Sequence, residues 1–527
     1  MGWLRGFGRR VGERVDRRTR RISALERRVA QLEAEKLIGS SIRSASRPKL
    51  GAPTPPGETE DDAGCKVRLT ARAQAELAEF LASGARLGCY RGGTAPDISV
   101  VVTLWNQAHF TLRCLRALLA QQGPSFEIIL VDNASTDETA QLLDRLDGCL
   151  ILRNSANTGF VTACNQGAAA ARGRALLLLN SDAFVRPDAL ANALATLEAD
   201  SRIGAVGGRL ILPSGRLQEA GSILWSDART YGYGRGLEAE TCEAMFRREV
   251  DYCSGAFFMT STLIWRLMGG FDEAYAPGYY EEADYCMRLR KAGYCVVYEP
   301  SVAVDHYEFG SEARDGDAMT VSRRNRKIFR DRHAEPLRLA HFPASAVNLL
   351  QARQRPSSGR LRRSLVVIDD LRRQLPPRLG QFGTAGFQHL AQSSTLTVFV
   401  IHPRKISWDD LRIYLAPDIE VVFCDESDGP ALGLTRLLEE REGHYDRVFA
   451  IEPSCVNLLR TLDRKIDYVL EGIPLMLGPK WTTEIGKLFV RSGGGGEESS
   501  SGASATEPVA RKVRLTEERF SPNPLRI

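Results

Sequence analysis

A short polar segment that follows an apolar run carries the residues best suited to bind a metal ion. Four consecutive leucines, Leu176 to Leu179, run directly into Asn180, Ser181 and Asp182. An apolar run of this length is typical of a strand buried on both faces, and open α/β sheets bind ligands at the carboxyl ends of such strands. A carboxylate held there can bind a divalent cation against a diphosphate. The same pattern also fits an ordinary Asp-containing turn after a strand.

Two further segments deliver polar groups to the ends of predicted strands. Residues 98–103 form a β-branched run that ends in a polar turn, and residues 127–131 form a second run that ends at Asp132. Between the two runs, leucines recur at helical spacing (Leu112, Leu115, Leu118 and Leu119). The order strand, helix, strand predicts a parallel sheet with several polar groups at one edge.

A cluster of acidic residues supplies candidates for a general base. Glu281, Glu282 and Asp284 place three carboxylates within four positions. A carboxylate near an acceptor hydroxyl can take its proton as the hydroxyl attacks. Adjacent residues on a helix diverge by about 100°, so the three cannot all face one site. The alternative is a solvated acidic turn that caps a helix.

Six motifs in the right order, between about residues 96 and 315, together resemble glycosyltransferase family 2, the inverting enzymes of GT-A fold. The motifs are residues 131–137, residues 154–160 with Asn165 and Gly167, residues 180–182, residues 254–256 with 269–273, residues 280–289, and residues 305–311. The chain has Asn180 where the common metal motif has Asp, and Glu281–Glu282 where the family usually has Glu–Asp. The closest subgroup is the rhamnosyltransferase-like enzymes.

The resemblance implies a role for each site residue. Glu282 aligns with the usual base, Glu281 is its rival, and Asp284 would orient the acceptor or support the structure. Asp182 and His306 would hold a divalent cation, Mg²⁺ or Mn²⁺. The residues expected to bind the nucleotide-sugar cofactor are Asp132, Asn133, Asn157, Gly159, Asn165 and Asn180. Asp132 would accept a hydrogen bond from uracil or thymine; its alternative role is to cap the following turn.

The expected function is inverting transfer of a sugar, such as a hexosyl or rhamnosyl group, from a UDP- or dTDP-sugar to a hydroxyl of a glycan or lipid-linked acceptor. One alternative is a sugar nucleotidyltransferase. Residues 104–109 lack the Gly- and Lys-rich loop that this class needs after its first strand. The other is a non-catalytic scaffold or binding protein derived from a transferase; retention of Asp182 and of all three acidic-helix carboxylates counts against it.

The composition of the chain restricts the class of protein and its cellular location. The 527 residues are 43% hydrophobic and 26% charged, as in ordinary globular chains. The net charge of +5 argues against a dedicated nucleic-acid binder. No apolar run approaches the roughly 18 residues that span a bilayer. Eleven cysteines without a CxxC pair indicate reduced thiols, so we expect a cytoplasmic protein, peripheral to the membrane if its basic N-terminal helix contacts lipid.

The chain divides into five predicted parts. Their order is a basic helical segment at 1–50, a linker and short helix at 51–95, the GT-A domain at 96–340, a smaller Rossmann-like α/β domain at 341–490, and a disordered tail at 491–527. The smaller domain resembles half of a GT-B glycosyltransferase and lacks a Gly-rich phosphate loop, which favours a structural or docking role. The predicted fold class is therefore α/β throughout.

Overall fold

The computed structural model describes residues 62–89, 95–308 and 315–355, and with gaps residues 362–462. The predictions for the basic segment at 1–50 and for the tail at 491–527 lie outside the described residues. The helix expected near residues 70–81 is present and longer than expected, as α2 (Asp62–Ala82).

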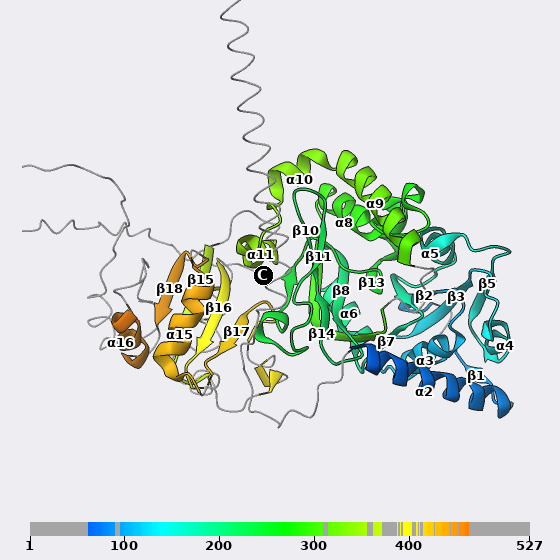
Figure 1. Ribbon diagram of the computed structural model, residues 1–527, viewed down its shortest axis with the longest axis horizontal. Helices are drawn as coiled ribbons and strands as arrows, with labels where there is room; N and C mark the ends of the chain where they lie inside the picture. Colours follow the sequence, from blue (N-terminus) through cyan, green and yellow to red (C-terminus); the bar gives the residue numbers. More distant parts are fainter. Residues whose placement is uncertain are drawn as a thin grey trace, which may run out of the picture.

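A ten-stranded mixed sheet forms the larger part of the fold (Figure 1). Its strands are β2 (Ile98–Leu104), β3 (Phe126–Asp132), β5 (Leu150–Arg153), β6 (Ala175–Asn180), β7 (Ala183–Val185), β8 (Ile203–Ile211), β9 (Leu217–Ala220), β12 (Arg248–Glu249), β13 (Phe257–Ser261) and β14 (Cys295–His306). The main order is β12-β14-β8-β13-β6-β2-β3-β5, with β7 beside β14 and β9 beside β8. Strands β3, β2 and β6 run parallel, as the sequence predicted. Strand β5 adds a further parallel strand beside β3, and β13 is antiparallel to β6.

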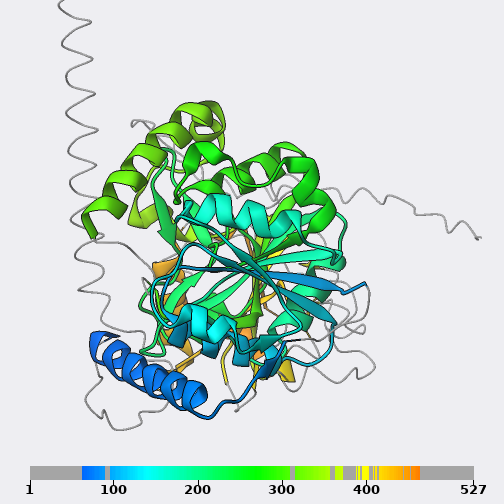
Figure 2. The same cartoon turned by 90° about the vertical axis from the view of Figure 1, so that its right-hand side faces the viewer.

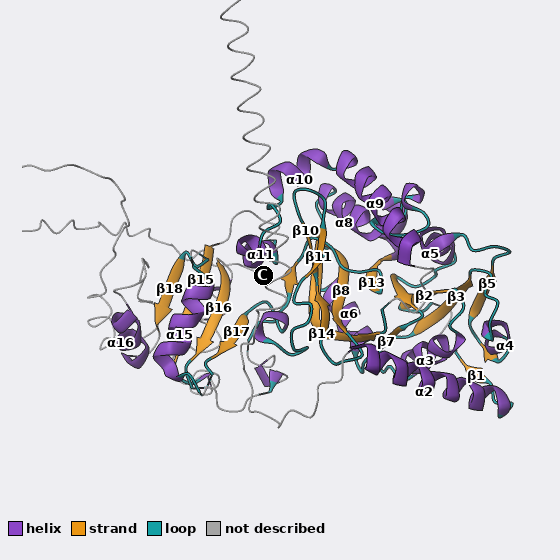
Figure 3. Ribbon diagram, in the orientation of Figure 1, coloured by secondary structure: helices purple, strands orange, loops and turns teal. Residues whose placement is uncertain are grey.

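Helices cover both faces of this sheet, as Figures 2 and 3 show for α3 and α5 on opposite sides. The helices are α3 (Ala108–Leu119), α4 (Thr139–Leu143), α5 (Gly159–Ala169), α6 (Ala189–Glu198), α7 (Thr262–Met268), α8 (Glu281–Lys291), α9 (Asp315–Arg332), α10 (Ala334–Ala340) and α11 (Ala346–Ala352). Two short pairs complete this part: β1 (Leu87–Gly88) with β4 (Leu146–Asp147), and β10 (Ser222–Leu224) with β11 (Thr230–Gly232). Short 3₁₀ turns lie at η1 (Cys242–Ala244) and η2 (Glu273–Tyr275).

The leucine run of β6 shows why a continuous apolar strand belongs here. Leu177 and Leu179 pack into the core on the α3 and α6 side, whereas Leu176 and Leu178 pack into the core on the α5 and α8 side. Successive side chains of a strand point to opposite faces. A strand with helices on both faces therefore needs apolar residues at every position, and the reading of β6 as doubly buried is confirmed.

A second sheet contains four parallel strands in the order β17-β16-β15-β18. They are β15 (Arg362–Ile368), β16 (Ser394–Val400), β17 (Glu420–Phe423) and β18 (Arg447–Ala450), with helices α15 (Gly429–Glu440) and α16 (Pro453–Leu462). In chain order the arrangement is 3-2-1-4, which matches one half of a Rossmann-like sheet. All four strands coincide with apolar runs that predict strands, at residues 365–368, 396–401, 420–423 and 447–451. The residues directly after β15, 372–386, lie outside the described part, so the lack of a phosphate loop remains a prediction, as do the domain limits.

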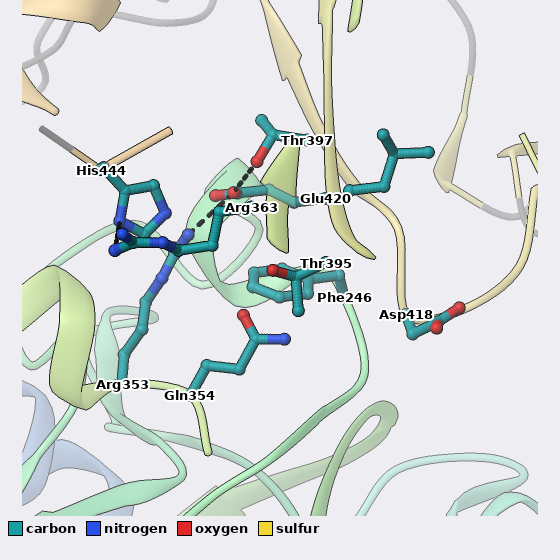
Figure 4. A pocket seen from close by; sticks show the side chains of 10 residues that line it. Phe246, Arg353, Gln354, Arg363, Thr395, Thr397, Asp418, Glu420 and His444 are labelled. Atoms are coloured by element: carbon teal, nitrogen blue, oxygen red, sulfur yellow. Dashed lines mark hydrogen bonds and ion pairs between the residues drawn. The ribbon is translucent and has the colours of Figure 1, made fainter. Parts of the chain in front are cut away.

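A buried ion-pair cluster joins the second sheet to the first part of the chain (Figure 4). Glu420 of β17 is 2% exposed, and its carboxylate accepts from Arg353 at 2.8 Å, from Arg441 at 2.9 Å and from Thr397 at 3.0 Å. Burial alone would raise the pKa of Glu420, but the two guanidinium groups outweigh it and lower that pKa. Three residues that line the adjacent pocket, Arg353, Thr397 and Glu420, are thus already bonded to one another.

Within the described ranges, no helix combines the length and the apolar character that crossing a membrane requires.

Candidate active site

The carboxyl ends of the parallel strands bring the first predicted site residues to one edge of the sheet. Asp132 is the last residue of β3 and Asn180 the last residue of β6. Both strands flank β2, where Leu104 pairs with Asp132 and Thr103 pairs with Asn180. The two polar residues therefore lie one strand apart at the same level, where ligands bind in open α/β sheets.

Asp132 has the turn-capping contact that the sequence left open. Its side chain is 6% exposed, and its Oδ1 accepts from the Ser135 backbone N–H at 3.0 Å. The loop after β2 is tied to the same turn: Asn106 N–H donates to Ser135 Oγ at 2.8 Å, and Asn106 Oδ1 accepts from Thr136 N–H at 2.7 Å. Nucleotide contact by Asp132 remains a prediction, and these bonds order the loops that such a contact would need.

The amides of the second motif build the loops at this edge. Asn133 is 3% exposed, and its Nδ2 donates to the Gly159 carbonyl at 3.1 Å. Its Oδ1 accepts from Asn154 Nδ2 at 2.8 Å and from Thr158 Oγ1 at 3.0 Å. Asn157 Oδ1 accepts from the Gly159 N–H at 2.9 Å. These contacts explain why short amides recur here, and donor binding by the same residues remains a prediction.

Asn165 and Gly159 connect α5 to the segment before the acidic helix. Asn165 Nδ2 donates to the Phe271 carbonyl at 2.9 Å and to Glu273 Oε1 at 3.0 Å, and its Oδ1 accepts from the Phe271 N–H at 2.9 Å. Gly159 has φ +83°, and a Cβ there would lie 2.6 Å from the Pro277 backbone. Glycine is therefore required by both the backbone conformation and the space.

The predicted metal ligands Asp182 and His306 come together through strand pairing. Strand β7 follows Asp182 and pairs antiparallel with the end of β14, where Ala183 lies opposite His306. Both side chains are buried, at 3% and 6% exposure, and Asp182 Oδ1 lies 3.3 Å from His306 Nε2. His306 Nδ1 lies 2.7 Å from Gln218 Oε1, which can only accept. Nδ1 then carries a proton, and in the neutral tautomer the Nε2 lone pair faces the carboxylate.

These groups fit a hard divalent cation that takes its remaining ligands from elsewhere. A carboxylate oxygen and an imidazole lone pair at this separation can both bind one ion, and the Gln218 contact fixes the imidazole orientation as partners of ligand histidines do. Asn180 Oδ1 is also buried, without a hydrogen-bond partner among the described residues. No group of three or more His, Cys, Asp and Glu side chains gathers in the described ranges. The chain thus offers an incomplete set, which diphosphate oxygens and water would complete.

The acidic pair lies at the first turn of α8. Tyr280 precedes the helix in the left-handed conformation, and Glu281 and Glu282 follow as the first helical residues. Burial, and secondarily Glu282, raise the pKa of Glu281 well above its ordinary value. Burial, with a further contribution from Glu219, raises the pKa of Glu282 to about 7. Burial thus favours the protonated form of both carboxyls, and the pKa of Glu282 near 7 suits a group that accepts a proton at neutral pH.

Asp284 has different surroundings from Glu281 and Glu282. It is fully buried and accepts from Arg288 at 2.7 Å, His333 at 2.8 Å and the Tyr275 hydroxyl at 3.1 Å. Burial would raise the pKa of Asp284, but the hydrogen bonds from His333 and Arg288 prevail and lower it to about 2. A carboxylate this acidic and this fully bonded makes a poor base. The sequence left Asp284 either to orient the acceptor or to support the structure, and its contacts favour structural support.

Strand β9 lies between the metal pair and the acidic pair, and sequence reasoning missed it. Gln218 contacts His306, while the next residue, Glu219, is 8% exposed and interacts electrostatically with both His306 and Glu282. Glu219 accepts from Ser222 Oγ at 3.0 Å, and burial raises its pKa. A four-residue strand with two polar residues gives no periodic signal, so only the three-dimensional pairing of β9 with β8 reveals this role.

Comparison with known proteins identifies the family to which the larger sheet belongs. Residues 99–260 match the model of glycosyl transferase family 2. The chain therefore carries a glycosyltransferase family 2 domain, and this match together with the observed mixed sheet confirms the predicted GT-A fold class.

Among curated relatives, the chain is 24% identical to the uncharacterized protein y4gI of Sinorhizobium fredii, over 44% of this chain and 27% of that protein. It is 27% identical to the N-acetylglucosaminyl-diphospho-decaprenol L-rhamnosyltransferase of Mycobacterium tuberculosis, over 45% of this chain and 85% of that enzyme. Among solved structures, the mannosyltransferase PcManGT of Pyrobaculum calidifontis, in complex with GDP-Man and Mn²⁺, is 20% identical. That match covers 53% of this chain and 79% of the other, with a TM-score of 0.34. The chain thus spans about a quarter of the first of these relatives and most of the second.

Proposed function

We propose that the protein is an inverting glycosyltransferase that moves a sugar from a UDP- or dTDP-sugar to a hydroxyl of a glycan or lipid-linked acceptor. The observation that carries the proposal is the position of β9. Its residue Gln218 contacts the Asp182–His306 pair, and its residue Glu219 interacts with Glu282. A cation site and a base with a raised pKa therefore belong to one site, as single displacement of a diphosphate requires.

The leaving-group side of the reaction is assigned to the edge of β6 and β14. Asp182 and His306 would hold a divalent cation, Mg²⁺ or Mn²⁺, which when bound neutralises charge that develops on the leaving diphosphate. Asn180 and Asp132 lie on neighbouring strand ends and would orient the donor. Gln218 keeps the His306 imidazole in the tautomer that can bind a cation.

The attacking side is assigned to α8. Glu282 would take the proton of the acceptor hydroxyl as it attacks the anomeric carbon, and inversion follows from this single displacement. A base works best with a pKa near the operating pH, and the pKa of Glu282 is raised to about 7. Glu281, protonated beside it, would donate a hydrogen bond rather than accept a proton.

The substrate class is inferred from one relative. The Mycobacterium tuberculosis relative is named as a rhamnosyltransferase that acts on a diphospho-decaprenol acceptor, which supports a lipid-linked acceptor and a deoxyhexose donor for this chain. Placement at the cytoplasmic side of a membrane, and contact through the basic N-terminal helix, remain predictions.

The first alternative, a non-catalytic scaffold, is disfavoured by the geometry. A scaffold has no use for two buried carboxyls side by side, because burial raises the pKa of both, so that their ionised forms cost stability. The second alternative, a nucleotidyltransferase, would require a basic phosphate loop after β2. The residues of that loop are instead Trp105, Asn106 and Gln107.

A donor screen tests the proposal. Nucleotide sugars would be incubated with the purified protein, with Mn²⁺ or with chelator, and nucleoside diphosphate release measured. We expect release from at least one UDP- or dTDP-sugar, dependent on the cation and lost in Asp182→Ala. Release that continues at the full rate in chelator, or no release from any donor even with glycan and lipid-linked acceptors present, would contradict the proposal.

A further inference from the structure

The loop that precedes the acidic pair has an unusual backbone. Tyr279 and Tyr280 are consecutive non-glycine residues with φ values of 74° and 73°. Side chains disfavour this left-handed region, and it persists only where surrounding structure imposes it. The chain enters α8 directly from these two residues. The orientation of the Glu281 and Glu282 side chains therefore depends on the contacts that hold Tyr279 and Tyr280 in this conformation.

A single asparagine of α9 holds it. Asn325 is fully buried, and its Nδ2 donates to three loop carbonyls: Tyr275 at 2.7 Å, Gly278 at 2.7 Å and Tyr279 at 3.0 Å. Its Oδ1 accepts from Arg324 Nε at 2.9 Å. The amide nitrogen has only two protons for three acceptors, so one bond is shared. The loop carbonyls thus turn inward toward one side chain.

The same helix supports the loop and α8 at two further points. The Phe329 ring packs against the ring of Tyr280 with centroids 5.3 Å apart. At the end of α9 and just beyond it, Arg332 and His333 bind the carboxylate of Asp284, two residues after Glu282. Contacts from α9 and from His333 therefore lie on both sides of Glu281–Glu282 along the chain.

We propose that Asn325 is a positioning residue for the transfer reaction: it holds Tyr279 and Tyr280 in the left-handed conformation and so sets where Glu281 and Glu282 enter the site. The inference rests on the proposed function, since it assigns Asn325 to the base side of that reaction. The donor side is elsewhere: Asp182 follows the end of β6, and His306 is the last residue of β14.

The test is a kinetic comparison of Asn325→Ala with Lys327→Ala, a matched change at an exposed position of the same helix. Both would be measured with the nucleotide sugar and acceptor that wild type turns over. Misplacement of a reacting group by an ångström lowers rates by about a hundredfold. We expect kcat of Asn325→Ala to fall by at least about tenfold, with the donor KM unchanged within about twofold, and Lys327→Ala to match wild type. Should Asn325→Ala not fold, Asn325→Ser, which keeps one donor, replaces it.

A double-mutant cycle separates positioning from general support. Glycine adopts positive φ readily, so at position 279 Tyr279→Gly removes the need for the Asn325 hydrogen bonds. In the Tyr279→Gly background, Asn325→Ala should lower kcat by much less than it does in wild type. Equal losses in both backgrounds, or a fall in donor affinity that parallels the fall in kcat, would overturn the inference. An inactive wild type would instead count against the proposed function, whereas an active wild type with an unaffected Asn325→Ala would refute only the positioning role.

Discussion

Replacing Glu282 by glutamine is the change whose consequences the structure defines most fully. The substitution keeps the size and the hydrogen-bonding reach of the side chain and removes its basicity. General bases contribute about a hundredfold to ten-thousandfold to a rate, so turnover should fall by at least about a hundredfold. Donor affinity should change little, because the predicted donor contacts lie on β3, β6 and α5.

The same substitution should stabilise the fold at alkaline pH. The pKa of Glu282 rises from its ordinary 4.5 to about 7 in the folded protein, chiefly through burial. A carboxyl whose pKa is raised by folding favours the folded state below its unfolded pKa and loses that contribution as pH rises through about 7. The difference amounts to roughly 3 kcal/mol at most, and coupling to Glu281 spreads it over both carboxyls. Glu282→Gln should therefore unfold at higher denaturant concentration than wild type at pH 8.

Two assays examine the two halves of this prediction. A pH–rate profile of wild type should rise about tenfold between pH 6 and pH 8, because a group with a pKa near 7 goes from about one-tenth to about nine-tenths ionised. Urea unfolding at pH 5 and pH 8 should show the gain of the variant only at the higher pH. Glu281→Gln is the matched control, and it should keep most turnover because burial raises the pKa of Glu281 and favours its protonated, non-basic form. A Glu282→Gln enzyme with normal kcat, or one less stable than wild type at both pH values, would refute the reasoning.

Three further changes test other parts of the site and fold. Asp182→Ala and His306→Ala should each abolish cation-dependent turnover while circular dichroism stays that of wild type; activity in chelator equal to that in Mn²⁺ would remove the cation role. Asp132→Ala should weaken uridine or thymidine diphosphate binding in calorimetry by about tenfold to a hundredfold, the value of one charge-assisted hydrogen bond, and unchanged affinity would assign Asp132 to turn capping alone. Glu420→Gln leaves Arg353 and Arg441 buried without their carboxylate, so urea unfolding should show a loss of about 3–5 kcal/mol; a variant as stable as wild type would mean that the ion-pair cluster does not hold the second sheet in place.

A smaller domain with only a structural or docking role would let a chain ending near Arg330 keep donor hydrolysis, but contacts in the structure conflict with this expectation. Such a chain lacks Arg332 and His333, which bind Asp284 beside the acidic pair. It also lacks Arg353, whose guanidinium lies over the rings of Tyr233 and Phe246. We now expect that truncation to lose activity, and an active product would show that these contacts are dispensable.

The sequence was most informative where residues repeat with a period. The alternation of two buried faces along β6, the leucine spacing of α3 and the four strands of the second sheet are local patterns, and all of them were predicted. Asp182 and His306 were paired by family resemblance, and the register of β7 with β14 supplies the physical reason for their approach. These features depend on a regular repeat or on an ordered set of motifs.

Contacts between distant, aperiodic segments could not be predicted. Gln218 and Glu219 lie on a four-residue strand, and Asn325 is one polar residue in an arginine-rich helix whose only local signal is its charge. Their roles arise from pairing and packing across the fold. The amides at Asn133 and Asn157 were assigned to the nucleotide from the motif, whereas their hydrogen bonds within the protein depend on loop conformations that periodicity does not encode.

The stereochemistry of the product tests the central claim most directly. That claim is that Glu282 activates an acceptor hydroxyl to displace the diphosphate in a single step. Proton NMR of the glycoside released by the wild-type enzyme, taken early in the reaction, gives the configuration at the anomeric carbon. Our account predicts a configuration opposite to that of the donor, and glycoside formation by Glu282→Gln that is slower by at least about a hundredfold. A product that keeps the donor configuration would contradict it, because one displacement by an activated hydroxyl must invert.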